Sequence, residues 1–353
     1  MDSLSTGAVL ALFLGGAVIT YIAGVNLAKA TDALDERFGL GEAIGGMILL
    51  SVAGSLPELA ITVSAAASGH LSIAAGNLIG GVAMQTFVIV IADIFVRGKR
   101  PLSTCAASLI PALEGLLVIA VVTITVMSAV LPATAAIGSV SVGSIGIVVV
   151  WMVGMVILNR TRTRTDLALV VAADEAPIEP VAASVADDGP DSVNGMMSGR
   201  SAVILFVIAS VVTLCSGVLL EKSGNQLAVD WNMNGVLFGA TILSAATALP
   251  EISSGITGAR LGRYTLVFGD MFGGNAFQVT LFLVADLVAG QPVLPSEGAS
   301  NAWIGCVGIV MTSVFVAGIL MRPRTRRWKL GPDSLVATAV YALGLWGLVY
   351  ISS

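Results

Sequence analysis

The sequence has few charged side chains and few of the residues from which most enzyme active sites are built. Charged residues make up 11% of the 353 residues and hydrophobic residues 56%, whereas a soluble domain has roughly 25% charged residues. Such a chain cannot bury all of its apolar surface in a soluble globule, so lipid must cover part of it. The shortage of charge therefore excludes a soluble protein and predicts a membrane protein.

Histidine, cysteine and basic patches are also scarce. His70 is the only histidine, which argues against a Ser/His hydrolase, and the three cysteines are isolated, with no spacing typical of a metal site or a disulfide framework. No basic patch interleaved with aromatic residues suggests nucleic acid. We therefore expect no enzyme activity and no cofactor. Inorganic cations and the lipid bilayer are the expected partners, and the oligomeric state, a monomer included, stays open.

Apolar runs bounded by charges and by proline or glycine predict an all-α integral membrane protein with ten transmembrane helices. A long polar segment rich in alanine, proline and glycine divides the ten into five and five, and we expect it to be a flexible linker. The first repeat is 1–158, the linker 159–200 and the second repeat 201–353. The spans are expected near 7–28, 44–68, 71–96, 106–129, 136–158, 201–220, 234–258, 264–288, 300–320 and 334–351.

Basic residues predict the orientation of these spans, because Lys and Arg in short loops stay on the cytoplasmic side. Of the 17 basic residues, only Lys222 falls on the opposite side from the others. This asymmetry places the linker in the cytoplasm and both termini outside the plasma membrane. Because each half has an odd number of spans, the second half enters the membrane from the opposite face, which predicts an inverted repeat.

The two halves share a sequence pattern in strict register. Ser51-Val52-Ala53-Gly54-Ser55-Leu56-Pro57-Glu58 recurs as Ser244-Ala245-Ala246-Thr247-Ala248-Leu249-Pro250-Glu251, and Pro57 and Pro250 are 193 positions apart. Each proline removes a helical hydrogen bond and frees a carbonyl within the membrane, where such a break survives only if protein, water or an ion satisfies it. Around each glutamate, hydroxyl side chains at helical spacing form one polar face. They are Ser51, Ser55 and Thr62 in the first copy, and Ser244, Thr247 and Ser254 in the second.

The next span of each half adds further polar groups. Gly76-Asn77-Leu78-Ile79-Gly80-Gly81 is matched by Gly269-Asp270-Met271-Phe272-Gly273-Gly274, and glycines four apart allow close helix packing. If the repeats pack about a pseudo-twofold axis, Glu58 faces Glu251, with Asn77 and Asp270 beside them. Such oxygen ligands suit Ca²⁺, Na⁺ or H⁺ rather than a soft metal, and an unused charge at that depth would cost at least ~2.5 kcal/mol.

Other polar residues in the spans are expected to have lesser roles. Gln85 and Gln278 are expected to make hydrogen bonds between helices, and Asp93 and Asp286 lie near span ends, where they could simply meet the membrane interface. Glu114 has no counterpart in the other half, and we expect it at the interface.

At these motifs the sequence resembles the calcium/cation antiporter superfamily, which includes sodium/calcium exchangers. Ala53-Gly54-Ser55-Leu56-Pro57-Glu58 is similar to the family's Gly-Thr-Ser-Leu-Pro-Glu, and the glycine motifs resemble Gly-Asn-x-x-Gly-Ser-Asn. The resemblance implies an antiporter that exchanges Ca²⁺ for Na⁺ or H⁺ by alternating access, the first and sixth spans sliding against the other helices. It also implies a metal site of Glu58, Glu251, Asn77 and Asp270 with carbonyls near Gly54 and Thr247; Ser55, Ser51 and Ser244 are further candidate ligands.

The chain departs from the family pattern at several hydroxyl positions. Gly54 replaces the threonine, Ala248 the second serine, Gly81 and Gly274 the serines after glycine, and Val82 the asparagine. The two glutamates remain, but hydroxyls that would ligate Na⁺ are missing, which weakens the case for Na⁺. Proton coupling needs only that Glu58, Glu251 or Asp270 be protonated in one leg of the cycle, so both counter-ions stay open.

Two other classes of protein could place acidic residues at this depth. A cation channel would also use mid-membrane acids, but an antiparallel duplication with broken helices favours a carrier. An intramembrane hydrolase would need two catalytic acids or a Ser/His arrangement, and His70 lies at a turn.

Overall fold

The computed structural model describes residues 4–38, 52–175 and 199–352, and these residues are almost entirely helical. The helices of the first half are α1 (Thr6–Phe38), α3 (Leu56–Ser68), α4 (Leu71–Ile94), α5 (Leu102–Cys105), α6 (Leu109–Ala129) and α7 (Val142–Glu175). Those of the second half are α8 (Gly199–Asp230), α9 (Gly235–Phe238), the π-helix η2 (Gly239–Leu243), α10 (Ser244–Thr247), α11 (Leu249–Leu261), α12 (Tyr264–Gln278), α13 (Leu281–Ala289), the 3₁₀-helix η3 (Leu294–Glu297), α14 (Gly298–Met321) and α15 (Pro332–Ser352).

Within these residues, eight helices are long and apolar enough to cross a membrane. A ninth candidate is the pair Gly235–Thr247 and Leu249–Leu261, bent by 50° at its break, and Leu56–Ser68 is a shorter apolar helix. The prediction of an all-α membrane protein is confirmed. The first part of the predicted span 44–68, up to residue 51, lies outside the described residues.

Several predicted boundaries differ from the structure. Helix α1 continues to Phe38 and α8 to Asp230, beyond the predicted span ends at residues 28 and 220. Residues 136–141 do not begin a span but form a hairpin of the strands β1 (Ala136–Ile137) and β2 (Val140–Ser141), and α7 starts at Val142. At its other end α7 runs through Arg160 to Glu175, so the first part of the predicted linker is helical. No glycine or proline occurs between Gly154 and Pro177, so nothing in the local sequence interrupts the helix.

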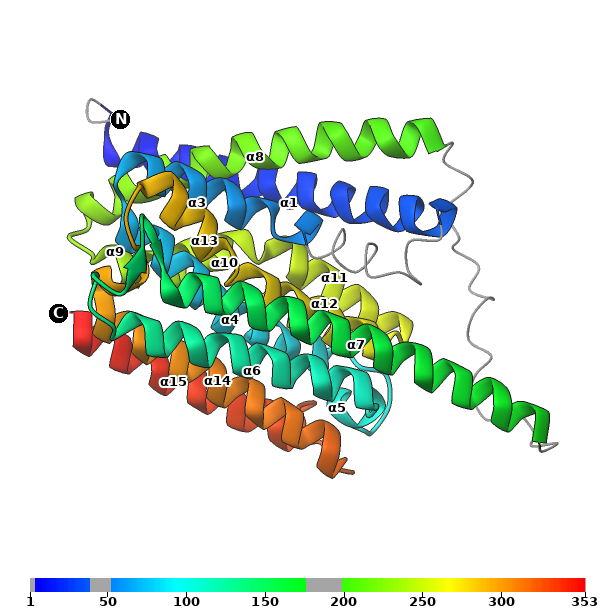
Figure 1. Ribbon diagram of the computed structural model, residues 1–353. Helices are drawn as coiled ribbons and strands as arrows, with labels where there is room; N and C mark the ends of the chain where they lie inside the picture. The colour runs from blue at the N-terminus through cyan, green and yellow to red at the C-terminus, as the bar shows by residue number, and fades with distance from the viewer. Residues whose placement is uncertain (1–3, 39–51, 176–198, 353) are drawn as a thin grey trace.

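The molecule has two distinct ends (Figure 1). Both termini lie at one end, which we call the termini end, where Thr6 Oγ1 donates to Asp230 Oδ2 at 2.7 Å. The other, which we call the linker end, contains Phe38 of α1 and the last turns of α7. Helices α1 and α8 run side by side along one side of the molecule, where Thr20 Oγ1 donates to Ser216 Oγ at 2.8 Å. The pair lies opposite α14 and α15.

Helices α1 and α8 cross the proline-containing helices at glycines in the same register. A Cβ on Gly24 of α1 would lie 2.5 Å from Pro250 Cγ, and one on Gly217 of α8 would lie 2.5 Å from Ala60 Cβ and 3.1 Å from the carbonyl oxygen of Pro57. Gly24 and Gly217 are themselves 193 positions apart. Helices α1 and α8 therefore have equivalent positions in the two halves.

The predicted glycine packing is present on α4. A Cβ on Gly76 would lie 2.6 Å from the carbonyl oxygen of Val236, and one on Gly80 would lie 2.2 Å from Ala240 Cα. Because neither glycine has room for a side chain, α4 lies directly against the backbone of α9 and η2. The Asn77 side of α4 is thereby held against the broken span of the second half.

Two buried aspartates join the halves at opposite ends. Asp93 Oδ2 accepts from the backbone nitrogen of Gly331 at 2.6 Å and from Ser334 Oγ at 2.8 Å, at the start of α15. Asp286 Oδ2 accepts from the backbone nitrogen of Ser141 at 2.9 Å and from Ser144 Oγ at 2.7 Å, at the start of α7. Each half thus fixes the first turn of the other half's last helix.

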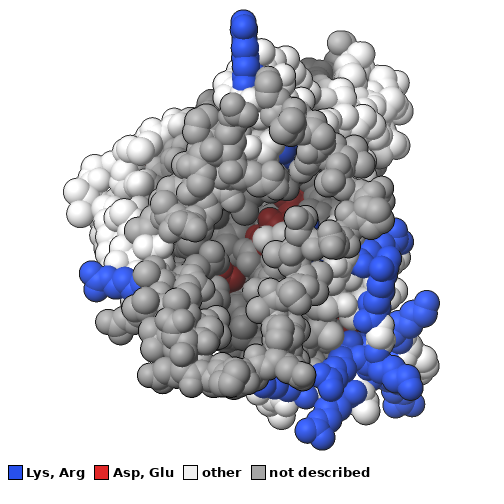
Figure 2. Space-filling view, turned by 90° about the vertical axis from the view of Figure 1, so that its right-hand side faces the viewer, with Lys and Arg blue, Asp and Glu red and all other residues white. Residues whose placement is uncertain are grey.

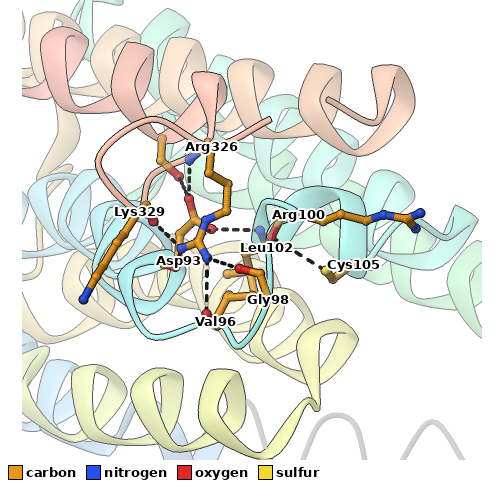
Figure 3. A network of polar contacts seen from close by, with 10 residues as sticks. Asp93, Val96, Gly98, Arg100, Leu102, Cys105, Arg326 and Lys329 are labelled. Carbon is orange, nitrogen blue, oxygen red and sulfur yellow. Dashed lines mark hydrogen bonds and ion pairs between the residues drawn. The ribbon is translucent and has the colours of Figure 1, made fainter. Parts of the chain in front are cut away.

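Both aspartates are 0% exposed, so the expectation that they could simply meet the membrane interface is wrong. The reason is that loop backbone nitrogens bind their other oxygens: Leu102 N donates to Asp93 and Val293 N to Asp286. Asp93 also lies 3.7 Å from Arg326 Nη2. The same guanidinium donates to carbonyls of the loop after α4, including those of Val96 and Gly98 (Figure 3).

Candidate functional site

The two Leu-Pro-Glu segments form helix breaks at equivalent positions. Before α3 the chain turns at Ser55, with φ −96° and ψ 15°, and between α10 and α11 it turns at Ala248, with φ −77° and ψ 0°. In both helices the proline occupies the first turn and the glutamate follows it. The break arises because proline has no N–H to continue the helix, and each glutamate therefore lies beside a helix N-terminus.

Glu58 is held deep inside the protein with few polar neighbours. It is 1% exposed, and neither carboxylate oxygen has a hydrogen-bond partner among the described residues. Thr247, from the break of the other half, lies next to it, and the buried hydroxyl of Thr62 one turn further along α3 also has no partner in the described part of the chain. A buried charge without partners is costly, so this carboxylate requires a cation or a proton.

Glu251 lies close enough to two other acids to be repelled by both. The negative charges of Glu58 and Asp270 both act on it. Ser254, one turn further along α11, has its Oγ 2.8 Å from Asp270 Oδ2. Glu251 of α11 and Asp270 of α12 therefore lie on sides of the two helices that face each other. A cation or a proton bound at Glu251 would relieve this repulsion.

Asn77 and the two glutamines complete the centre. Asn77 is 0% exposed, and within the described residues its side-chain nitrogen and oxygen have no hydrogen-bond partner. As expected, the glutamines join the two halves: Gln85 Nε2 donates to Gln278 Oε1 at 3.0 Å. Gln278 Nε2 in turn donates to the backbone oxygens of Leu78 at 2.9 Å and Asn77 at 3.3 Å.

A cavity extends from Glu251 and Asp270 toward the linker end. It has a volume of about 240 Å³, and its lining includes Glu251, Asp270 and Gly54 as well as Lys29 and Thr257. A smaller cavity of about 30 Å³ lies beside it, lined by Gly54, Ser55, Gln85, Glu251, Gly269, Asp270 and Gly274. Seen from the linker end, acidic side chains are visible near the middle of the molecule, and most of the basic side chains gather at its outer edge, at the lower right of Figure 2.

The remaining predicted ligands have different surroundings. Gly54 and Ser55 line the small cavity, and Thr247 lies next to Glu58. Ser244 Oγ instead donates to the carbonyl oxygen of Ala240, in the preceding η2, at 2.8 Å. Ser51 lies outside the described residues. No three His, Cys, Asp or Glu side chains form a metal-sized group in the described ranges, so carbonyl, hydroxyl, amide or water oxygens would have to complete a cation site.

Sequence reasoning missed a second buried polar cluster, at the termini end. Glu221 of α8 is 0% exposed; its Oε1 lies 2.7 Å from His70 Nδ1, and its Oε2 accepts from Ser64 Oγ at 2.6 Å. Asn225 Nδ2 lies 3.1 Å from His70 Nε2. This glutamate could not be recognised as a buried polar residue from the sequence. It is adjacent to a charged residue, Lys222, and the matching position in the first half is Ala28, which is not acidic. Glu114, expected at the interface, is also buried, at 5% exposure, close to Gly269.

Comparison with known proteins identifies the fold. A family model described as "Sodium/calcium exchanger protein" matches residues 8–161 and 201–350, which is most of the chain. The chain belongs to this family. As a sodium/calcium exchanger family protein it is a cation antiporter of the calcium/cation antiporter superfamily, a multi-pass membrane transporter and not an enzyme.

Individual relatives of this exchanger family protein are distant. Inner membrane protein YrbG of Escherichia coli (strain K12) is 25% identical over 292 residues, or 82% of this chain and 80% of YrbG. The structure of the sodium-calcium exchanger NCX_Mj has a TM-score of 0.61 at 14% identity and covers 96% of this chain and 98% of NCX_Mj. The H⁺/Ca²⁺ exchanger CAX has a TM-score of 0.65 at 15% identity and covers 97% of this chain and 87% of CAX. At these identities the structural likeness shows the fold.

Proposed function

We propose that the protein exchanges Ca²⁺ for a monovalent cation across the plasma membrane, with Glu58 and Glu251 as the central ligands. The observation that carries this proposal is the oxygen-lined cavity that Glu251 and Asp270 share, together with the Glu58 carboxylate, which is buried and has no hydrogen-bond partner among the described residues. Ca²⁺ takes six to eight oxygen ligands, carboxylates among them. Asn77, Thr247, Ser55 and the carbonyl of Gly54 are proposed to supply the others.

The counter-ion is Na⁺ or H⁺, and the missing hydroxyls favour H⁺. Residues 54, 81, 248 and 274 carry no hydroxyl in this chain. The carboxylates of Glu58, Glu251 and Asp270 can take up protons in place of Ca²⁺ without further ligands. When empty, the centre has uncompensated negative charge, so the vacant protein resists reorientation, and exchange becomes obligatory.

Alternating access is supported by a difference between the two ends at equivalent positions. Ser64 and Thr257 are 193 positions apart. At the termini end Ser64 is buried and bonded to Glu221 of α8, whereas at the linker end Thr257 is exposed and lines the open cavity beside α1. This difference between the ends, seen among the described residues, supports a carrier rather than an open channel.

Transport of ⁴⁵Ca²⁺ into proteoliposomes tests the proposal. We expect uptake driven by an outward Na⁺ or H⁺ gradient in the unmodified protein, and a loss of at least about 100-fold in Glu58→Gln and Glu251→Gln, the size expected when one member of a buried charge interaction is removed. Asp230→Asn, at the exposed end of α8, is the matched control. Activity that survives both glutamine substitutions would refute the site, and Ca²⁺ flux that neither gradient drives would indicate a channel.

A further inference from the structure

We propose that a basic surface at the linker end binds the phosphate group of an anionic phospholipid. Figure 2 shows basic side chains gathered at one outer edge of this end. Residues 94–108 and 321–331, which include the loops after α4 and α14, contain no Asp or Glu. The positive charge is therefore not neutralised within these loops. The basic surface consists of their exposed basic side chains, which are Arg97, Lys99, Arg100, Arg322, Arg324, Arg327 and Lys329.

A buried network fixes the two loops relative to each other (Figure 3). The Arg326 side chain is 8% exposed, and its guanidinium donates to the carbonyl oxygens of Val96 and Gly98 at 3.2 Å each. In Figure 3 the side chains of Arg100 and Lys329 extend away from this network. The network thus holds the loop backbones in place and leaves these two side chains accessible to a ligand.

The tip of the loop after α14 is a tight turn at Trp328 and Lys329. The backbones of Arg327 and Leu330 exchange two hydrogen bonds, of 2.8 and 3.0 Å, and the two residues between them have φ 53° and 65°. Such a turn favours Asn-Gly, because both central residues need a positive φ. Its geometry therefore does not explain Trp and Lys at these positions. Trp328 is 78% exposed, and tryptophan is enriched at the level of the lipid headgroups.

The equivalent loops at the termini end show that the fold does not need these basic residues. Asp286 joins the two halves there as Asp93 does at the linker end. The position that matches Trp328 is Ala135. Because uncharged loops make the same connection, the basic surface and Trp328 have another role than joining the halves. The residues 193 positions from the members of the basic surface are all uncharged: Gly290, Pro292, Val293, Ala129, Leu131, Thr134 and Ala136.

The position of the basic surface favours a lipid as its ligand. Helices α4 and α14 are candidate spans that end at Ile94 and Met321, so both loops begin where the chain leaves the hydrocarbon region. Leu320 and Met321 are 65% and 81% exposed, and they offer apolar surface to the acyl chains of the same lipid. Clusters of Lys and Arg next to a span attract anionic headgroups, and phosphate oxygens accept charge-assisted hydrogen bonds from both side chains. Membrane insertion alone would require the charges, but neither the fixed loop backbone nor the exposed tryptophan.

Quenching of Trp328 fluorescence by brominated lipids tests the proposal with the purified protein in detergent. Anionic phosphatidylglycerol and uncharged-overall phosphatidylcholine, each brominated near the head of the acyl chains, are added to separate samples. Every protein is also made with Trp328→Phe, which gives the signal of the other four of the five tryptophans. We expect phosphatidylglycerol to bind at least about tenfold more tightly than phosphatidylcholine. Arg324→Gln with Arg327→Gln should lower this preference at least about fivefold, the contribution of one basic side chain at a membrane surface.

Two further variants and one competitor make the result specific. Arg324→Lys with Arg327→Lys keeps the charge and should keep most of the preference. Arg200→Gln with Lys222→Gln removes two exposed basic residues of α8 and should leave the preference unchanged. Inorganic phosphate at matched ionic strength should not displace phosphatidylglycerol. Thermal melting shows that each variant folds.

Four results would overturn the inference. They are equal binding of the two lipids by the unmodified protein, full preference in the protein with both Arg→Gln substitutions in the loop, an equal loss in the α8 control, and displacement of the lipid by inorganic phosphate, which would assign the surface to a free anion. Lipid binding does not require Ca²⁺ transport, so each result is independent of the proposed function.

Discussion

At the level of single side chains, the buried carboxylates fall into two groups that differ in their partners. Asp93 and Asp286 accept hydrogen bonds from backbone nitrogens and serines on both oxygens. Glu58 has none from the described residues, and one oxygen of Glu251 has none either. A satisfied carboxylate stabilises the fold, whereas an unsatisfied one has capacity left for a ligand. The difference in hydrogen bonding thus separates the two aspartates that join the halves from the two glutamates that we propose as cation ligands.

Asp93 and Asp286 give a stability prediction. Asp93→Asn should destabilise the protein by about 3–5 kcal/mol because it leaves the Arg326 guanidinium without its buried counter-charge. Asp286→Asn should cost about 1–3 kcal/mol, since only hydrogen bonds are weakened and no described basic residue pairs with Asp286. Denaturant unfolding in detergent measures both, with Asp230→Asn as the exposed control. Equal losses in the two variants would show that the contact with Arg326 contributes nothing.

At the level of elements, two helices with matching positions have different contacts at the two ends of the molecule. Helix α8 is tied through Glu221 to Ser64 of α3 and to His70, just before α4. Helix α1 borders the open cavity through Lys29 and Thr31. In the alternating-access scheme α1 and α8 slide together against the other helices. The Glu221 cluster must therefore break when the termini end opens, and we interpret it as the closed gate.

Removing one partner of this gate should shift the protein toward opening at the termini end. In a background with Cys105, Cys215 and Cys306 replaced by serine, Thr257→Cys reports the open cavity by its rate of thiol labelling in detergent. Adding His70→Ala should slow that labelling roughly threefold or more, since it releases Glu221 from α4 and favours the alternate state.

Lys222→Ala is the matched control, because Lys222 is exposed and adjacent to Glu221 on α8. A labelling rate for the His70→Ala protein that equals the control would show that the cluster only stabilises the helix packing. Labelling does not depend on Ca²⁺ transport, so it tests the gate separately from the proposed function.

At the level of the whole molecule, basic residues gather at the outer edge of the linker end, as Figure 2 shows. Described members of this group are Arg97, Lys99, Arg100, Arg322, Arg324, Arg327 and Lys329. Lys and Arg in short loops are retained in the cytoplasm. The open cavity would then face the cytoplasm, and the closed gate would face outside.

Reporter fusions test this orientation. We expect alkaline phosphatase fused after Ser353 to be active, because it folds only outside the cytoplasm, and green fluorescent protein fused at the same place to be dark. Fusions truncated within residues 176–198 should give the reverse result. An active phosphatase at the linker would contradict the charge asymmetry and would place the open cavity on the outer side.

Much of the candidate site could be predicted from the sequence, because charged residues within membrane spans are rare. In this chain a glutamate occurs within a span at the same position of both halves. Glu58 and Glu251 are each adjacent to a proline in an apolar run, which is a local pattern. The roles of Asp93 and Glu221 could not be predicted in this way. Gly331 is 238 residues from Asp93 and His70 is 151 from Glu221, and no periodicity within one helix reports such a partner.

The sequence by itself determined the membrane class, the inverted repeat and the acidic residues at its centre, since hydropathy, proline breaks and the 193-residue register are properties of the chain. Only the tertiary structure decided which of the described carboxylates remain without partners, that Gln85 pairs with Gln278 across the two halves, and which acids line the cavity. These properties depend on distances between helices. Helix packing sets those distances, whereas a sequence pattern specifies only the face of each helix on which a side chain lies.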